Sequence, residues 1–397
     1  MKRANTVGAA ALLAALALGL VLAVSSFFGG EGHLEALLKG GDPAAVLEGA
    51  ESALNQDLDE DHLFIQLYGG FQRLAGRRLI EDPVEDNSVV RLSNGTLNFI
   101  NLLSSDKPGP AVADNAQAAA DFAGAVEALG IPCLYVAAPQ KIQRDSNLLP
   151  VGLAENGNSS CDALLSALEE AGADTLDLRP LFEENGVYAD WFFRTDHHWR
   201  PEGAFFAWQY LARTVDVLAT DPALTDPASW DTQVLEDFFL GSQGKRVGSL
   251  YAGTDDFTVY TPKFETDLHY TCPFYAIDRE GPFNQSVCFP ERIAGQDWFG
   301  GNPYTYYAGG DYPLASIVNR KNPEGPRVLL VRDSFACALT PFLALSCSEL
   351  ITVDLRYFQG DLLETVEAQR PDLVLTLYTA SSTGNPEMFS YAGPDGE

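Results

Sequence analysis

The chain has 397 residues, which is enough for one large domain or two domains of ordinary size. Apolar residues make up 46% of the sequence and aromatic residues 11%, so a sizeable core is expected and a disordered protein is disfavoured. Acidic residues number 55 against 25 basic ones, which gives a formal net charge of −30. Such a charge repels nucleic acid and other polyanions, so the composition argues against a nucleic-acid partner.

An uncharged, apolar run covers residues 7–28 and follows Lys2 and Arg3. Its length is close to the ~20 residues that a membrane-spanning helix needs. The positive flank places the N-terminus in the cytoplasm and the rest of the chain outside. A cleaved signal peptide is the alternative, although its apolar core usually has only ~7–15 residues. We therefore predict a signal anchor over residues 1–28, a stalk over residues 29–56, and a single-pass cell-membrane protein with an extracytoplasmic domain.

The remaining residues, 57–397, alternate between strand and helix patterns, which indicates an α/β domain with a doubly wound, mostly parallel sheet. A hairpin is expected first, near residues 89–92, because Asn94-Gly95 is a strong turn signal. The expected strands are residues 131–138, 174–178, 327–331, 350–355 and 373–378, and the expected helices are residues 115–129, 161–171, 202–218, 334–345 and 361–368.

Residues 221–325 differ from this pattern because they are rich in glycine, proline and aromatic residues. Short strands and loops fit such a composition better than helices do. We interpret the segment as a large insertion that covers the edge of the sheet and one wall of the cleft. Its aromatic side chains either pack beneath loops or form platforms on which sugars stack.

The six cysteines show neither a Cys-x-x-Cys motif nor the spacing of a zinc site. In an exported protein, the pairs Cys272–Cys288 and Cys337–Cys347 are close enough in sequence to be candidate disulfides. The alternative is that the thiols are free and buried, where cysteine behaves as a small apolar residue.

Ser334 is a first candidate for chemistry, in the stretch Arg332-Asp333-Ser334-Phe335. It follows an expected strand and begins an expected helix, so it projects from the edge at which open α/β sheets bind ligands. The N–H groups of a first helical turn lack partners and can hold a developing oxyanion. The alternative is a purely structural role, because Asp and Ser are also favoured helix N-cap residues.

A second candidate stretch, Asp196-His197-His198-Trp199, lies far upstream. A serine nucleophile needs a base, and the base needs an orienting acid. Asp196 and His198 are two residues apart, so in an extended segment both side chains leave on the same side and His197 points away. We therefore predict a Ser-His-Asp site. The alternatives are a hydrogen-bonded histidine pair at a helix start and a metal site, which lacks a further ligand cluster, so we expect no metal and no cofactor.

The stretch from Trp191 to Trp199, followed by Gly203-Ala204, resembles the signature of the DHHW family. That family is similar to the SGNH-like alginate O-acetyltransferases, which carry Asp-x-His-Trp upstream and Gly-Asp-Ser-Phe downstream, a permuted order relative to most SGNH hydrolases. The resemblance covers roughly residues 57–380, with Arg332 in place of the glycine. Three further stretches agree with it: Pro139-Gln140-Lys141, Gly248-Ser249-Leu250-Tyr251 and Asp354-Leu355-Arg356-Tyr357.

The resemblance implies that Asp196 is the orienting acid, His198 the base and Ser334 the nucleophile of an O-acetyltransferase or acetylesterase. The implied substrate is a cell-surface or exported polysaccharide, and the implied partner is a membrane-bound O-acyltransferase that supplies acetyl groups. The alternative is a non-catalytic polysaccharide-binding or assembly protein on the same fold. The side chains expected to contact the substrate are those of Arg356, Lys141, Tyr251 and Trp199.

Overall fold

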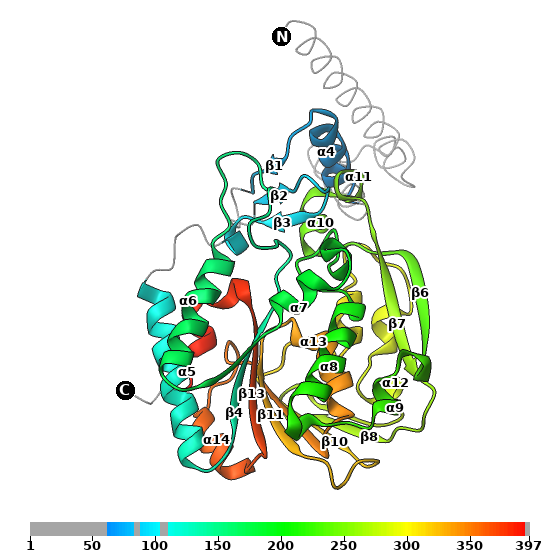
Figure 1. Ribbon diagram of the computed structural model, residues 1–397. Coiled ribbons are helices and arrows are strands. Elements are labelled where there is room, and N and C mark those ends of the chain that lie inside the picture. The colour runs from blue at the N-terminus through cyan, green and yellow to red at the C-terminus, as the bar shows by residue number, and fades with distance from the viewer. Residues whose placement is uncertain (1–61, 83–87, 104–109, 394–397) are drawn as a thin grey trace, which may run out of the picture.

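The structure is a computed structural model that describes residues 62–82, 88–103 and 110–393 (Figure 1). The signal anchor expected over residues 1–28 and the stalk expected over residues 29–56 lie outside these ranges. Among the residues that the structure describes, no helix has the length and apolar character needed to cross a membrane.

An eight-stranded sheet forms the centre of the molecule and confirms the predicted mixed α/β architecture (Figure 1). Its first five strands pair in parallel, and the last three join them in antiparallel register. In spatial order the strands are β5 (Asp174–Asp177), β4 (Cys133–Ala138), β13 (Leu373–Thr379), β11 (Arg327–Arg332), β12 (Glu349–Val353), β10 (Leu314–Asn319), β8 (Leu268–Cys272) and β9 (Ile277–Gly281).

Helices cover both faces of this sheet, and strand β11 shows why the sequence predicted a buried strand. Val328 and Leu330 belong to the apolar core on one face, whereas Leu329 and Val331 belong to the core on the other. A strand buried on both faces has no polar alternation, so it appears in the sequence as a continuous apolar run. The first face carries α8 (Pro201–Thr214) and α13 (Ala336–Ala344), and the second carries α5 (Pro110–Ala128), α6 (Gly157–Glu170) and α14 (Leu362–Gln369).

The segment 221–325 does more than cover the sheet edge, because its strands β8, β9 and β10 extend the sheet itself. Its aromatic side chains are largely core residues: Tyr270 is 1% exposed, and Phe257 and Tyr307 are fully buried. Packing, rather than sugar stacking, therefore accounts for these rings. The other elements of the segment include β6 (Trp230–Phe239), its antiparallel partner β7 (Asp255–Pro262), α9 (Pro222–Thr225) and α12 (Phe283–Ser286).

A smaller unit with its own apolar core lies at the top of the molecule in Figure 1. The predicted hairpin belongs to it, and Gly95 in its turn has a φ of 88°, a conformation that favours glycine. Lys141, three residues after β4, donates to the carbonyl oxygen of Leu97 at 2.6 Å, so the unit adjoins the carboxyl ends of the parallel strands. Its elements are α4 (Leu63–Leu74), β1 (Leu79–Ile80), β2 (Val89–Arg91), β3 (Leu97–Phe99), α10 (Ser242–Val247) and α11 (Ser249–Ala252).

All six cysteines are buried and carry free thiols. The candidate disulfides Cys272–Cys288 and Cys337–Cys347 are therefore not formed, and the alternative of small buried side chains holds. Cys347, for example, is fully buried in the core that lies between α8 and the sheet.

Candidate active site

The loop that carries Asp196 and His198 is closed at its base by a β-bridge between Phe192 and Trp199. Inside the loop the backbone bends, and it is not the extended segment that the sequence suggested. The bend is held by Asp255 at the start of β7, whose carboxylate accepts from the backbone N–H groups of Arg194 (2.7 Å) and Thr195 (2.8 Å). A buried carboxylate from a distant strand thus fixes the shape of the loop.

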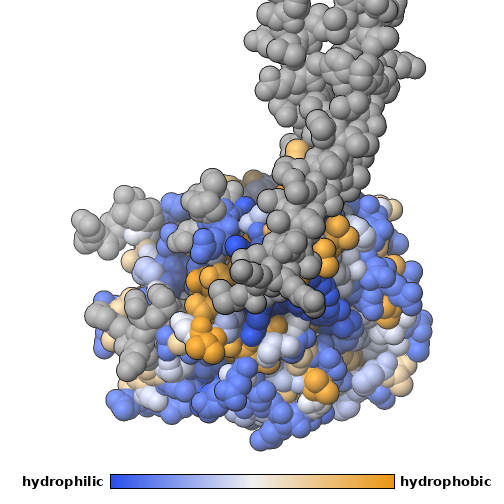
Figure 2. All heavy atoms as spheres, turned by 90° about the horizontal axis from the view of Figure 1, so that it is seen from above, coloured by the Kyte–Doolittle hydropathy of each residue, from blue (hydrophilic) through white to orange (hydrophobic). Residues whose placement is uncertain are grey.

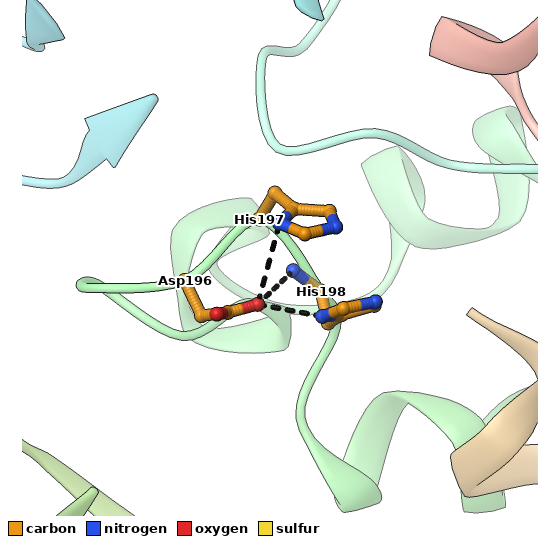
Figure 3. Close-up of side chains that lie close together, drawn as sticks. All are labelled: Asp196, His197 and His198. Carbon is orange, nitrogen blue, oxygen red and sulfur yellow. Dashed lines mark hydrogen bonds and ion pairs between the residues drawn. The ribbon is translucent and has the colours of Figure 1, made fainter. Parts of the chain in front are cut away.

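Three side chains predicted to act together do lie together in a hydrogen-bonded chain. His198 Nδ1 is 2.6 Å from Asp196 Oδ1, and His198 Nε2 is 2.8 Å from Ser334 Oγ. An ionised carboxylate only accepts hydrogen bonds, so the imidazole proton belongs on Nδ1 and Nε2 is free to accept from the serine hydroxyl. Figure 3 shows the ring of His198 beside the Asp196 carboxylate.

The carboxylate of Asp196 is almost completely buried, with 4% exposure. Its Oδ1 also accepts from the His198 backbone N–H at 3.0 Å, and its Oδ2 accepts from the Ser242 N–H at 2.6 Å. Burial alone would raise the pKa of Asp196, but the neighbouring imidazoles of His197 and His198 and these hydrogen bonds hold it well below its usual value. The group is therefore an anion that can orient the imidazole.

Ser334 lies in the turn between β11 and α13, and Asp333 holds this turn in place. One carboxylate oxygen of Asp333 accepts from the Phe335 N–H at 3.0 Å, and the other accepts from the Thr379 N–H at 2.8 Å and the Ser382 hydroxyl at 3.0 Å. These bonds tie the nucleophile turn to the end of β13, the neighbouring strand. Burial raises the pKa of Asp333, and these three donors oppose that rise.

The first helical turn offers fewer free N–H groups than the sequence suggested. Besides Phe335, the Ala336 N–H donates to the Asp333 carbonyl oxygen, and the Cys337 N–H donates to the Ser334 carbonyl oxygen. Within the described ranges, no acceptor is found for the N–H of Ser334 itself. This single backbone N–H is therefore the group in the turn that remains available to a developing oxyanion.

His197 does not point away from the site, which corrects the expectation drawn from an extended segment. Its ring packs against the ring of His198 with centroids 3.9 Å apart, and its Nδ1 lies 3.5 Å from Asp196 Oδ1 (Figure 3). Burial and the nearby His198 lower the pKa of His197, so the ring is neutral at physiological pH. His197 is 26% exposed and forms part of the surface of the site.

Asp196, His197 and His198 also offer ligand atoms that all lie within 4.8 Å of one another, which is close enough to consider a metal ion. The 2.6 Å separation between His198 Nδ1 and Asp196 Oδ1 is that of a charge-assisted hydrogen bond, with the proton between the two atoms. The other imidazole nitrogen is engaged by Ser334. The donor set thus matches a hydrogen-bonded triad better than a metal centre.

Trp199 was expected to contact substrate, but its side chain is completely buried. Its indole N–H donates to the carbonyl oxygen of Phe335 at 2.8 Å. The hydroxyl of Tyr304 donates to the same oxygen at 2.8 Å, and the Tyr304 ring stacks on His198 with centroids 4.0 Å apart. Both aromatic residues are therefore buried beside the site, where they hydrogen-bond to its backbone instead of facing a ligand.

Lys141 and Tyr251 are likewise structural in this arrangement. The Lys141 ammonium, which is 4% exposed, donates to the carbonyl oxygens of Leu97 and Arg194 and to Gln243 Oε1. Tyr251 is fully buried in the core of the upper unit, and its hydroxyl donates to the Arg77 carbonyl oxygen. Neither side chain presents a surface to a substrate, so the expected contacts are not supported.

Arg356 keeps partial exposure, 21% of its side chain, but it is already held by two carboxylates. It makes a two-point contact with Asp354 and a 3.0 Å bond with Asp311. Asp311 also binds the buried guanidinium of Arg332 at 3.0 Å, which explains how an arginine is accommodated where SGNH hydrolases have glycine. The two arginines lower the pKa of Asp311 against the effect of burial.

Sequence reasoning missed four residues that shape the site: Gly241, Ser242, Asp255 and Tyr304. Each comes from the segment 221–325, at least 40 residues from the Asp196 loop in the printed sequence. No spacing in the sequence connects them to the triad, because long-range packing alone brings them there. Gly241 shows how tight this packing is: a Cβ at this position would lie 2.2 Å from the Asp196 Cβ.

Two sequence models of known families match parts of the chain. The model described as "SGNH hydrolase-like domain, acetyltransferase AlgX" matches residues 101–237. The model described as "DHHW protein" matches residues 184–353, which include both Asp196 and Ser334. The predicted resemblance to DHHW proteins is thereby confirmed. A search of curated proteins finds no match.

Solved structures share the fold at low sequence identity. A DHHW family protein from Eubacterium siraeum DSM 15702 has a TM-score of 0.60 and 18% identity, covering 80% of this chain and 98% of its own. PatB1 from Bacillus cereus has a TM-score of 0.62 and 20% identity, covering 79% of this chain and 99% of its own. A second PatB1 structure, with a sulfonyl adduct, has a TM-score of 0.64 and 20% identity, covering 78% of this chain and 100% of its own.

Proposed function

We propose that the protein is a serine O-acetyltransferase or acetylesterase that acts on a cell-surface or exported polysaccharide. The observation that carries this proposal is the continuous hydrogen-bonded chain from Asp196 through His198 to Ser334. The match to a sequence model named for an acetyltransferase supports the reaction type. The resemblance of the stretch from Trp191 to Trp199 to the signature of the DHHW family, which is similar to the alginate O-acetyltransferases, supports that substrate class.

The geometry supports one role for each of the three hydrogen-bonded residues. Ser334 Oγ attacks the carbonyl carbon of an acetyl ester while His198 Nε2 takes the serine proton, and the Asp196 carboxylate stabilises the imidazolium that forms. The Ser334 N–H supports the negative charge on the carbonyl oxygen. When the tetrahedral intermediate collapses, the leaving alcohol takes the proton from His198, and an acetyl group remains on Ser334.

The second half of the reaction returns the acetyl group to an acceptor. A sugar hydroxyl attacks the acetyl-serine carbonyl, His198 accepts its proton, and the proton then goes back to Ser334 Oγ as the ester bond breaks. With water as acceptor, the same steps release acetate, which is the esterase reaction. We further propose that residues 1–28 anchor the domain outside the cytoplasm, where a membrane-bound O-acyltransferase supplies the acetyl groups.

The alternative function is non-catalytic binding or assembly of polysaccharide on the same fold. That function would not require Ser334 to be accessible or the imidazole of His198 to face it. The 2.8 Å distance between His198 Nε2 and Ser334 Oγ, together with the partial exposure of Ser334, favours the enzyme.

The test is the substitution Ser334→Ala, measured as release of p-nitrophenol from p-nitrophenyl acetate. We expect loss of at least ~10³-fold in turnover, with an unchanged midpoint of thermal unfolding, because the hydroxyl contributes chemistry and little packing. Ser159→Ala is the matched control, since Ser159 is an exposed serine on α6. Wild-type turnover in the Ser334→Ala variant would refute the proposed nucleophile.

A further inference from the structure

An open groove of about 750 Å³ lies in the upper unit, outside the triad. Its walls come from α4, from β1 and β2, from α10, and from a loop that contributes Phe299 (Figure 1). This volume falls within the roughly 300–1,000 Å³ typical of ligand sites. Figure 2, which looks down on this face, shows apolar patches set among hydrophilic surface. We call this feature the α4 groove.

The α4 groove contacts the triad residue Asp196 through Ser242 and lies beside His197 through Phe99. Ser242 lines the groove, donates its N–H to Asp196 Oδ2 at 2.6 Å, and places its hydroxyl 3.4 Å from His197 Nδ1. Phe99 also lines the groove, and its ring centroid lies 6.4 Å from that of His197. Because His197 packs against His198, one side chain, that of His197, lies between these lining residues and His198.

Aromatic rings line the outer part of the groove. Tyr68 on α4 lines the groove and is 51% exposed, which is high for a large aromatic side chain. Phe299 is held by a stacked contact with His62, with ring centroids 4.1 Å apart and planes at 24°. Partly exposed rings of fixed orientation offer flat apolar faces to a ligand that also carries polar groups.

The acidic and basic residues that line the groove are equal in number, and both basic side chains already have partners. Its acidic residues are Glu81 and Asp82, and its basic residues are Lys245 and Arg246. Arg246 lies 3.5 Å from Asp82, and the Lys245 ammonium donates to the Gly301 carbonyl oxygen at 2.6 Å. An anionic polymer would need uncompensated cations here, and the net charge of −30 would oppose it further.

We propose that the α4 groove binds a neutral glycan chain and directs one of its hydroxyls toward Ser334. A pyranose ring has an apolar face that can lie on Tyr68 or Phe299 and hydroxyls that can bond to the charged groups of the wall. The inference rests on the proposed acyl transfer at Ser334, because the groove then holds the acceptor. It adds the charge class of the substrate and the surface that selects it.

The experiment compares the double variant Tyr68→Ala/Phe299→Ala with the wild-type protein in isothermal titration. The probes are four neutral tetrasaccharides, namely cellotetraose, mannotetraose, xylotetraose and chitotetraose, and one acidic probe, tetragalacturonate. We expect at least one neutral probe to bind and the double variant to raise its Kd at least tenfold. The matched control is Phe274→Ala/Tyr275→Ala, which removes two exposed rings elsewhere, Tyr275 being 51% exposed like Tyr68.

Hydrolysis of p-nitrophenyl acetate separates this inference from the proposed function. Ser334→Ala should lose this hydrolysis and keep the wild-type Kd for the neutral probe, because Ser334 does not line the groove. Absence of binding by every neutral probe, an unchanged Kd in the groove variant, or tighter binding of tetragalacturonate would overturn the inference. If the double variant unfolds, Tyr68→Ala alone, at an exposed position, gives the same comparison. Binding with no Ser334-dependent hydrolysis would instead refute the proposed reaction and leave a neutral-glycan site.

Discussion

The indole N–H of Trp199 donates to the carbonyl oxygen of Phe335 at 2.8 Å, so the residue that follows the base is bonded to the residue that follows the nucleophile. These two residues are 136 positions apart in the chain. The bond therefore joins the Asp196 loop to the start of α13, beside the contact between His198 and Ser334. We expect Trp199 to act as a positioning residue.

Trp199→Phe should lower kcat for p-nitrophenyl acetate roughly tenfold while KM changes little, because small displacements of reacting groups are costly. The lost hydrogen bond should reduce the free energy of unfolding by about 1 kcal/mol. Tyr304→Phe removes the other donor to the same oxygen, so the double variant should lose more activity than the product of the single losses. Additive effects would show that the two bonds do not act on one carbonyl as a unit.

Asp196→Asn should lower kcat by roughly 10⁴-fold, the size seen when a triad aspartate becomes asparagine. The amide cannot accept from the imidazole as the carboxylate does, so the ring proton shifts to Nε2 and faces Ser334. The nitrogen chemical shifts of His198 report this change of tautomer directly. Asp278→Asn is the matched control, because Asp278 binds His269 at 2.7 Å on the exposed strand pair β8–β9. An unchanged rate in Asp196→Asn would remove Asp196 from the triad.

Gly241→Ala should impair catalysis although Gly241 has no functional group. A Cβ there would lie 2.7 Å from Asp196 Oδ2 as well as 2.2 Å from the Asp196 Cβ, so the carboxylate must move. We expect a loss of kcat on the order of 10²-fold with the fold retained. Gly124→Ala is the control, since nothing lies within 4 Å of a Cβ at that position on α5, and alanine should stabilise the helix by roughly 0.5–1 kcal/mol. Full activity in Gly241→Ala would contradict the close packing.

The strands could be predicted from the sequence because their signals are local, as in β11, which is apolar on both faces. The grouping of Asp196, His198 and Ser334 was predicted from their motifs, although the segment that carries Asp196 and His198 is bent, not extended, and Ser334 lies 136 positions from His198. The roles of Lys141, Tyr251 and Trp199 could not be predicted, because their polar atoms are satisfied by backbone carbonyl oxygens that only the folded chain brings near. A polar or aromatic residue in a motif therefore indicates a structural or functional role, but it does not indicate whether the side chain is exposed to a substrate.

The orientation of the His197 side chain could not be predicted from the sequence either, for a related reason. Its direction depends on the bend of the loop, and that bend depends on Asp255 of β7. The extension of the sheet by β10, β8 and β9 was missed because these strands pair in antiparallel register and their segment is rich in loop-forming residues. Local sequence patterns do not show which distant strand will pair at the edge of the sheet, or which distant strand will supply the hydrogen bonds that shape a loop.

Lys141→Met should change how stability depends on pH. Burial lowers the pKa of Lys141 to about 7, against the opposing charges of Asp196 and Asp255, whereas an exposed lysine has a pKa of 10.5. Between these values the unfolded chain still binds a proton that the folded chain has released. The free energy of unfolding of the wild-type protein should therefore rise with pH through this window. The variant lacks this contribution, because methionine has a similar length and no charge.

The measurement is urea-induced unfolding of both proteins at about pH 7 and about pH 9.5. From about pH 7 to about pH 9.5, the free energy of unfolding of the wild-type protein should rise by roughly 2–3 kcal/mol relative to that of Lys141→Met, at about 1.4 kcal/mol per pKa unit. Lys321→Met controls for a surface lysine, since the Lys321 side chain is 45% exposed. A constant difference between wild type and Lys141→Met would mean that Lys141 stays charged over this range. Its three N–H groups would then match its three acceptors, Leu97, Arg194 and Gln243, at every pH tested.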